Sequence, residues 1–384
     1  MNALRNWQRF LNKSLKQPGY ALKVFSKRLA SFSSYVFGAG KSSYPEAVTL
    51  FLTHRCNLRC KMCGQWGEGG VTKKDTSQHI REELSVVELN SVIDDLAVFR
   101  PNITLFGGEP LLYPSVTDLI SRIKQKGMHC LMITNGSLLE KAAEEIVASG
   151  LDELNLSLDG KGEEHDRIRG LPGLFNQIMA GLQKINYYKE QKNRKIPLIN
   201  LQCTINRDNY QHLEQLTEVA RQVKANSLTF HNLIFLDRSI IQEQEKINQE
   251  LGCDSLAWEG FIFEPGMDIG LLSRKIAQVK AGTYPFSVDF YPNFSREELL
   301  DYYSNKNYRP SGGAARCLSP WMVAYIFPDG QVKPCLNFSY TYGNIKNNKF
   351  TELWNDPQAI KFRRQLKQHR LFPVCARCTE LYRY

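Results

Sequence analysis

The stretch Cys56–Cys63, CNLRCKMC, holds three cysteines in the pattern Cys-x3-Cys-x2-Cys and closely follows the apolar run Ala47–Leu52. Three thiolates on one short loop can bind three corners of a cube-shaped iron–sulfur cluster and leave the fourth iron open to another ligand. Zinc also binds clustered cysteines, so the spacing indicates a metal site before it indicates which metal. The rest of the sequence has to distinguish between the two.

A second motif, Gly107-Gly108-Glu109-Pro110, follows the apolar residues Leu105 and Phe106. Glycines allow a backbone to approach a ligand closely, and the Glu109 carboxylate can accept hydrogen bonds from an ammonium group. Taken by itself, the motif could also be a simple turn.

Together and in this order, the two motifs resemble those of the radical S-adenosylmethionine (SAM) enzymes. In that family the open iron of a [4Fe-4S] cluster chelates the amino acid end of SAM, and reduction of the cluster splits SAM to a 5′-deoxyadenosyl radical. The resemblance implies that Cys56, Cys60 and Cys63 bind this cluster. It also implies that the radical abstracts hydrogen from an unactivated C–H bond of a substrate.

The resemblance further implies contacts with SAM. The residues Gly107, Gly108, Glu109 and Pro110 would approach the cofactor, and Glu109 would receive its ammonium group. Met62, before the third cysteine, stands where the family prefers a bulky apolar residue at the adenine. Four more positions match family contacts: Asn135 near SAM, Ser157 at the ribose, Arg169 at the carboxylate and Ile205 at the adenine. For the polar residues among these, capping the next helix is the alternative role.

Apolar segments that end in polar residues alternate with helical patterns through residue 235. Strands are predicted at 47–52, 131–136, 154–160, 201–206 and 227–231, and helices at 82–93 and 113–120. This alternation implies parallel strands joined by crossover helices, which is the α/β class. The resemblance specifies a partial (βα)6 TIM-like barrel with its active site at the carboxyl ends of the strands. His231, at one such end, is either a proton carrier or a histidine with an ordinary hydrogen-bond partner.

Four more cysteines lie near the carboxyl end: Cys317, Cys335 and the pair Cys375-x2-Cys378. Asp329-Gly330 between apolar runs predicts a hairpin there. Spacing alone favours a zinc ribbon, but the region resembles the SPASM domain of radical SAM proteins, here a small α+β domain. The larger SPASM pattern has seven cysteines and two extra clusters. Four cysteines suffice for one, so we predict a single, fully protein-ligated auxiliary [4Fe-4S] cluster that favours electron transfer.

The amino-terminal segment is basic: residues 1–40 contain seven Lys or Arg residues and no Asp or Glu, within a net charge of +10 for the chain. Two amphipathic helices are predicted around Pro18-Gly19, with apolar stripes over Leu4–Leu15 and Leu22–Val36. Through residues 1–38 they could contact an anionic membrane surface, or they could pack on the barrel exterior. A transit peptide is a third interpretation. No nucleic-acid motif appears, and no nucleic-acid partner is expected.

The chain is predicted to divide into four parts. They are an amino-terminal extension (1–45), a radical SAM core (46–235), a bridging insert (236–310) and an auxiliary cluster domain (311–384). The insert fits neither strand–helix repetition nor the cysteine domain. Its position would let it cover the open barrel, and Glu264 is one of its candidates for shaping a substrate pocket.

The predicted clusters account for seven of the ten cysteines, so we expect a reducing compartment and no disulfides. Of the others, Cys130 and Cys203 are expected to pack in strands, and Cys253 lies in the insert. No run approaches the length of a membrane-spanning helix. We therefore expect a cytoplasmic protein, with peripheral attachment to the inner face of the membrane as an option.

The expected activity is that of a radical SAM oxidoreductase or maturase that carries out a net oxidation or forms a C–C or C–X bond. A small-molecule or lipid-linked substrate is the first hypothesis, because the residues before the first strand are too few and too basic for the peptide-binding domain of many relatives. Modification of a peptide or protein side chain is the alternative, and a zinc-stabilised scaffold is the non-enzymatic one. A flavodoxin or ferredoxin would donate the electron.

Overall fold

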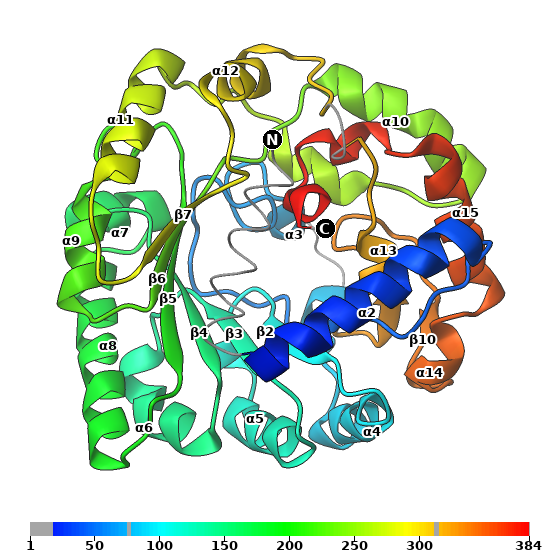
Figure 1. Ribbon diagram of the computed structural model, residues 1–384, viewed down its shortest axis with the longest axis horizontal. Helices are drawn as coiled ribbons and strands as arrows, with labels where there is room; N and C mark the ends of the chain where they lie inside the picture. Colours follow the sequence, from blue (N-terminus) through cyan, green and yellow to red (C-terminus); the bar gives the residue numbers. More distant parts are fainter. Residues whose placement is uncertain (1–17, 75–77, 311–314, 384) are drawn as a thin grey trace.

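A ten-stranded sheet forms the centre of the computed structural model, which describes residues 18–74, 78–310 and 315–383 (Figure 1). The strand order is β10-β9-β8-β1-β2-β3-β4-β5-β6-β7. All pairs from β8–β1 to β6–β7 are parallel, whereas β8–β9 and β9–β10 are antiparallel. The strands are β1 (Ala47–Phe51), β2 (Asn102–Phe106), β3 (Cys130–Thr134), β4 (Glu153–Ser157), β5 (Leu198–Thr204), β6 (Ser227–His231), β7 (Ser287–Tyr291), β8 (Val323–Ile326), β9 (Gln331–Lys333) and β10 (Gly343–Asn344).

Helices join successive parallel strands and form an outer layer around the sheet (Figure 1). This arrangement confirms the predicted α/β class and its crossover connections. The crossover helices are α4 (Val86–Leu96), α5 (Val116–Gln125), α6 (Leu139–Ser149), α7 (Glu163–Arg169), α8 (Leu174–Gln191), α9 (Gln215–Gln222), α10 (Arg238–Leu251) and α11 (Ile269–Ala281). The others are α2 (Pro18–Phe37), α3 (Val71–Lys74), α12 (Arg296–Ser304), α13 (Ser319–Met322), α14 (Phe350–Leu353) and α15 (Pro357–His369).

Two parallel strands extend the sheet beyond the predicted six. β7 comes from the predicted bridging insert and pairs with β6, whereas β8 comes from the cysteine-rich carboxyl region and pairs with β1. An open barrel of six strands would leave two edges with unpaired backbone groups, and β7 and β8 cover both of them. The sheet therefore runs continuously across the predicted domain borders, which remain predictions.

Local signals determine where several elements begin and turn. Ser85 and Glu88 form a reciprocal capping box, so α4 starts after Ser85, later than its periodicity indicated. Ser115 has a positive φ of 62°, so α5 starts only after it. The predicted hairpin at Asp329-Gly330 is confirmed, because Gly330 has a φ of 89° and connects β8 to β9.

Helix α2 packs through its polar face on residues at the amino ends of strands. Lys27 Nζ donates to two carbonyl oxygens just before β2, at 3.0 and 3.2 Å. Arg28 forms a 2.8 Å ion pair with Glu46, just before β1. The ring of Tyr35 lies edge-on to that of Trp321 with centroids 4.9 Å apart, just before β8.

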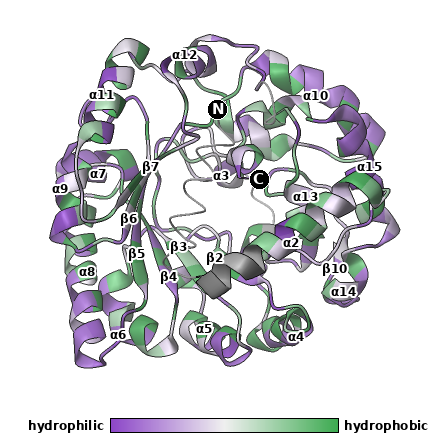
Figure 2. Cartoon of the chain, viewed as in Figure 1, coloured by the Kyte–Doolittle hydropathy of each residue, from purple (hydrophilic) through white to green (hydrophobic). Residues whose placement is uncertain are grey.

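Part of the apolar stripe of α2 is exposed to solvent, and Figure 2 shows hydrophobic and hydrophilic residues alternating along this helix. Leu29, Phe32 and Val36 are 60%, 39% and 38% exposed. Packing on the barrel therefore accounts for only part of this stripe, and contact with a membrane stays a prediction. The other predicted stripe, Leu4–Leu15, lies outside the described residues. Within the described ranges, no helix is long and apolar enough to cross a membrane.

Candidate active site

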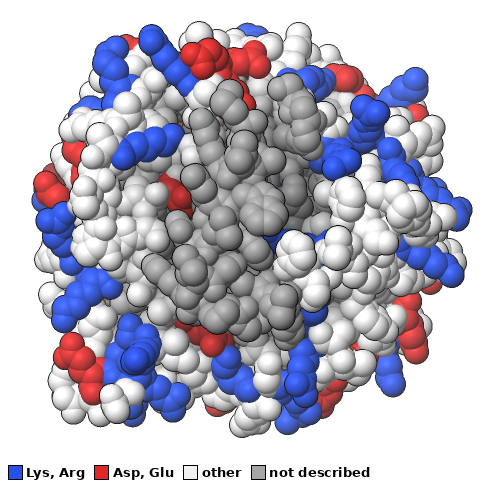
Figure 3. Space-filling model, in the orientation of Figure 1, with Lys and Arg blue, Asp and Glu red and all other residues white. Residues whose placement is uncertain are grey.

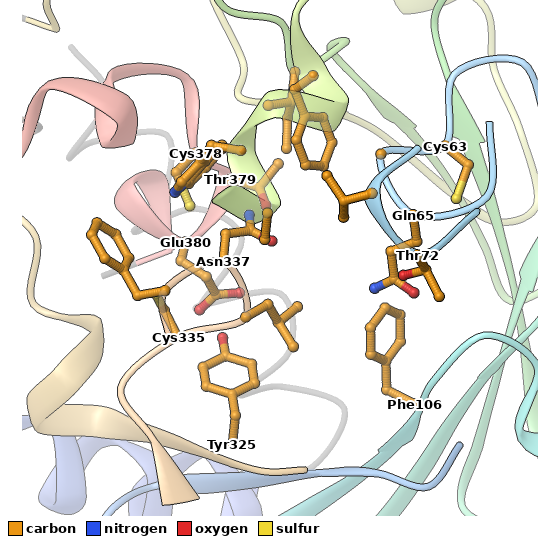
Figure 4. Close-up of a pocket in the computed structure, with 18 of the residues that line it drawn as sticks. Cys63, Gln65, Thr72, Phe106, Tyr325, Cys335, Asn337, Cys378, Thr379 and Glu380 are labelled. Carbon is orange, nitrogen blue, oxygen red and sulfur yellow. The ribbon is translucent and has the colours of Figure 1, made fainter. Parts of the chain in front are cut away.

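One cavity of about 710 Å³ at the carboxyl ends of the parallel strands brings both groups of cysteines together. All seven predicted ligand cysteines line it, and their role as cluster ligands stays a prediction. Figure 4 shows Cys63 on one side and Cys335 and Cys378 on the opposite side. The ends of β2 to β6 contribute Phe106, Thr134, Ser157, Thr204 and His231 to the wall.

The first cysteine group lies on the loop between β1 and α3, with N–H groups directed at its sulfurs. Backbone N–H groups donate to Cys56 Sγ at 3.5 Å and to Cys63 Sγ at 3.3 Å. Arg169 donates to Cys60 Sγ at 3.7 Å. Burial raises the pKa of Cys56 to about 11 and also raises that of Cys60. Because a thiol gives up its proton when it binds iron, iron binding would release protons at these two positions.

Arg169 forms a buried ion pair instead of an open anion site. Its Nε lies 2.6 Å from Asp159 Oδ2, and the Asp159 side chain is fully buried. Because the same guanidinium also reaches Cys60, it connects the end of β4 to the cysteine loop. Arg169 lines the cavity. The predicted contact with the SAM carboxylate stays a prediction, and Asp159 is a partner that sequence reasoning missed.

Glu109 is fully buried behind the cavity wall and binds residues that line the cavity. Its carboxylate accepts hydrogen bonds from Leu111 N (3.0 Å), Thr134 Oγ1 (2.7 Å) and Asn135 N (2.7 Å). Burial raises the pKa of Glu109, and these donors oppose that rise. Asn135 in turn donates to Asn57 Oδ1, within the cysteine loop, at 3.0 Å. The carboxylate thus holds the residue that contacts the loop, and its predicted role at the SAM ammonium stays a prediction.

The two glycines before Glu109 are required by close backbone packing. A Cβ on Gly108 would lie 2.2 Å from Arg55 O, and one on Gly107 would lie 2.6 Å from Thr53 O. Neither position can accept a side chain without moving the segment that leads from β1 to the cysteines. Both glycines also line the cavity.

The other predicted SAM contacts divide into two groups. Met62, Asn135 and Ser157 line the cavity. Pro110 is buried and begins a 3-10 turn (Pro110–Leu112), and Ile205 is fully buried in the core; neither lines the cavity. None of these contacts is tested without bound SAM, so all stay predictions.

The four carboxyl-terminal thiols lie within one another's electrostatic field. Burial raises the pKa of Cys317 and Cys335 to about 12, and Cys335 raises that of Cys317 further. Burial and then neighbouring thiols raise the pKa of Cys375, with Cys378, Cys317 and Cys335 all contributing. A backbone hydrogen bond from Cys378 N to Cys375 O, at 3.0 Å, closes the Cys-x2-Cys turn.

The two thiol sets suit iron–sulfur clusters by their chemistry. One has three thiols and the other four, all largely withdrawn from water, and the first receives N–H donors on sulfur. In the described part of the chain, no three Cys, His, Asp or Glu side chains converge as they would around a single metal ion. We infer that the three-thiol set would hold the SAM cluster and the four-thiol set the auxiliary cluster.

The bridging insert closes the cavity beside the first cysteine group. Trp258 and Phe261, on the 3-10 helix η3 (Leu256–Phe261), line the cavity. A Cβ on Gly260 would lie 2.0 Å from Gly64 O, directly after Cys63, so backbone meets backbone there. Glu264 lies outside the cavity, is 82% exposed and faces Lys306 at 3.8 Å.

His231 lines the cavity but already has a side-chain partner. Its Nε2 lies 2.6 Å from Gln202 Oε1, and its ring meets Tyr291 edge-on at 5.7 Å. Sequence reasoning missed Tyr325 and Lys333, which line the opposite wall on β8 and β9. The predicted hairpin at Asp329-Gly330 could have indicated both residues, because they lie in its two strands, close to Cys335.

Two family models match the chain. Residues 50–199 match the radical SAM superfamily, and residues 317–379 match the SPASM iron-sulfur cluster-binding domain. Both domain expectations from the sequence are confirmed. The first domain implies a [4Fe-4S] cluster with SAM, and the second implies auxiliary iron–sulfur chemistry.

Several named proteins are similar over most of the chain. The Fe-coproporphyrin III synthase of Methanosarcina barkeri is 27% identical over 94% of this chain and 87% of its own length. The pre-heme d1 synthase of Dinoroseobacter shibae is 26% identical over 87% of this chain and 78% of its own. The crystal structure of Streptococcus suis SuiB superposes with a TM-score of 0.59 at 13% identity, over 86% of this chain and 70% of that one. The last match shows a shared fold.

Proposed function

Because this chain is a radical SAM enzyme with a SPASM iron–sulfur domain, we propose that it carries out a net oxidation or forms a C–C or C–X bond on a small-molecule substrate. A bound SAM cluster supplies the reductive cleavage of SAM that starts such reactions. The observation that carries the proposal is the single cavity lined by all seven cysteines. A substrate in that cavity lies between the site of hydrogen abstraction and an electron acceptor.

The chain's own residues would bind the clusters and the substrate, orient the substrate and shield the radical from water. Cys56, Cys60 and Cys63 would hold the SAM cluster, and the ring of Trp258 helps to keep water from the cavity. The carboxyl-terminal thiols would hold the cluster that accepts the substrate's electron. A flavodoxin or ferredoxin would deliver the first electron.

Small-molecule chemistry is favoured over peptide modification. Relatives that cover most of the chain are named for coproporphyrin and heme synthesis. The wall of the cavity is largely apolar and aromatic, as in pockets that enclose small ligands. A peptide or protein side chain remains the alternative that the experiment below distinguishes.

Deuterium transfer tests the proposal. Anaerobically reconstituted enzyme, SAM and a strong reductant are mixed with fractions of a deuterium-labelled cell extract, and 5′-deoxyadenosine is analysed by mass spectrometry. We expect deuterium from a small-molecule fraction. Deuterium from the peptide fraction alone would support the peptide alternative, and deuterium from none would contradict the proposal.

We also propose that the exposed stripe of α2 contacts an anionic membrane surface. Basic side chains border its carboxyl half: the Arg316 guanidinium lies 5.4 Å from the ring centroid of Phe32, and Lys367 donates to Val36 O at 2.9 Å from α15. Figure 3 shows Lys and Arg side chains gathered on the α15 side of this face. Apolar side chains with cations on one side suit an anionic bilayer.

Helix α2 lies both at the amino ends of strands and near the auxiliary cysteines. Its contacts with Glu46 and Phe99 lie just before β1 and β2, whereas the ring of Phe32 lies 5.4 Å from Arg316, which precedes Cys317 of the cavity wall. A bilayer under α2 would therefore anchor the enzyme.

Vesicle binding by the double variant Leu29→Ser/Phe32→Ser checks the membrane contact. We expect its binding to anionic phosphatidylserine vesicles to fall about tenfold or more, because two large apolar side chains lose their burial in the bilayer. The control Val87→Ser/Leu300→Ser changes exposed apolar side chains on other helices and should bind normally. Equal binding by both variants in a sedimentation assay would contradict the contact.

A further inference from the structure

Lys333 holds a positive charge inside the cavity, beside the auxiliary thiols. Its Nζ lies 4.2 Å from the ring centroid of Phe327. That ring stacks on Phe51, with centroids 5.2 Å apart and planes 11° from parallel. Phe51 of β1 therefore holds the Phe327 ring in position, and this ring in turn positions the ammonium group of Lys333 in the cavity wall.

The only other Lys or Arg among the described residues that line the cavity is Arg169, which is already paired with Asp159. Lys333, by contrast, forms no ion pair with a described carboxylate. Lys333 ends β9 (Gln331–Lys333), Cys335 of the auxiliary thiol set follows two residues later, and both residues line the cavity. The ammonium group and this thiol therefore border the same space.

Building on the proposed function, we propose that Lys333 is a positioning residue that raises the reduction potential of the auxiliary cluster. Reduction adds one negative charge to a cluster, and a nearby cation in a poorly solvated cavity favours the reduced state. After hydrogen-atom transfer to the 5′-deoxyadenosyl radical, the substrate radical would lose one electron to this cluster and one proton to water, so a higher potential would make the oxidation more favourable.

Redox titration of the auxiliary cluster alone tests the inference. The parent carries Cys56→Ala, Cys60→Ala and Cys63→Ala, so that one cluster remains, and electron paramagnetic resonance follows its reduction. In Lys333→Gln we expect the ratio of reduced to oxidised cluster at a fixed potential to fall about tenfold, which is 59 mV for a one-electron couple. Lys333→Arg keeps the charge and should stay close to the parent. Lys346→Gln, an exposed lysine after β10, is the matched control.

The outcomes separate this inference from the proposed function. A parent that binds no reducible cluster would overturn the auxiliary cluster and with it both proposals. A parent that titrates normally, with Lys333→Gln at the same potential, would overturn the role of Lys333 alone. A potential that falls equally in Lys333→Gln and Lys333→Arg would also overturn it, because shape and not charge would then be responsible.

Discussion

Replacing Cys56, Cys60 and Cys63 with alanine is expected to reduce 5′-deoxyadenosine formation to background while about half of the cluster iron remains. The three thiols are the proposed ligands of the cluster that cleaves SAM. The other four lie across the cavity and contribute nothing to the first site (Figure 4). Iron analysis and a SAM-cleavage assay on the same anaerobic preparation measure both effects.

A cysteine outside both sets provides the control. Cys130 is fully buried in β3 and does not line the cavity, so Cys130→Ala should keep its iron and its SAM cleavage. Metal analysis of the unaltered protein also addresses the zinc scaffold hypothesis. Bound zinc in place of iron after anaerobic reconstitution, or SAM cleavage by the triple variant, would contradict the assignment of the first cysteine group.

The cysteine motifs and the central strands could be recognised in the sequence because each depends on a short, local pattern of residues. The spacing in Cys56–Cys63 needs only one loop, and strands such as β1 are continuous apolar runs that are buried from end to end. The same holds for the Asp329-Gly330 turn. The pairing of β8 with β1 could not be predicted in this way, because it joins segments more than 270 residues apart.

Roles that depend on distant partners were also beyond sequence reasoning. The contact of Arg169 with the SAM carboxylate stays a prediction, but its ion pair with Asp159, ten residues earlier in the chain and brought close by α7, had no signal in the sequence. The same holds for Glu109, whose oxygens accept three hydrogen bonds from the protein while its contact with SAM stays a prediction. A charged residue in a motif predicts a functional site, but its hydrogen-bond or ion-pair partner within the protein can be identified only from the folded structure.

For helix α2, the sequence predicted the element but not the face that packs on the protein. The periodicity of Leu29, Phe32 and Val36 predicted an amphipathic helix, and a helix is present. Periodicity cannot say which face touches the protein. Here Arg28 and Tyr35 make those contacts, because Glu46 and Trp321 offer an ion pair and a ring to the polar face.

Replacing Cys375 and Cys378 with alanine is expected to separate SAM cleavage from product formation. The first cysteine group would still cleave SAM, and deuterium from the substrate would still enter 5′-deoxyadenosine. The substrate's electron would lack its acceptor, so product should fall about a hundredfold or more, since electron transfer needs the cluster as a carrier. Mass spectrometry of 5′-deoxyadenosine and of the active extract fraction, before and after reaction, measures the two yields together.

Cys253 is a stringent control for this variant, because it lies near the auxiliary cysteines without belonging to the proposed ligand set. It is half-buried and close enough to Cys335 to raise the pKa of that thiol, but it does not line the cavity. Cys253→Ala should therefore keep the auxiliary iron and the product yield. If the Cys375→Ala/Cys378→Ala variant kept the auxiliary iron, the proposed ligand set would be wrong. If that variant lost the auxiliary iron but kept the product yield, the oxidation would need no auxiliary acceptor, and the cavity that joins the two cysteine groups would serve binding alone.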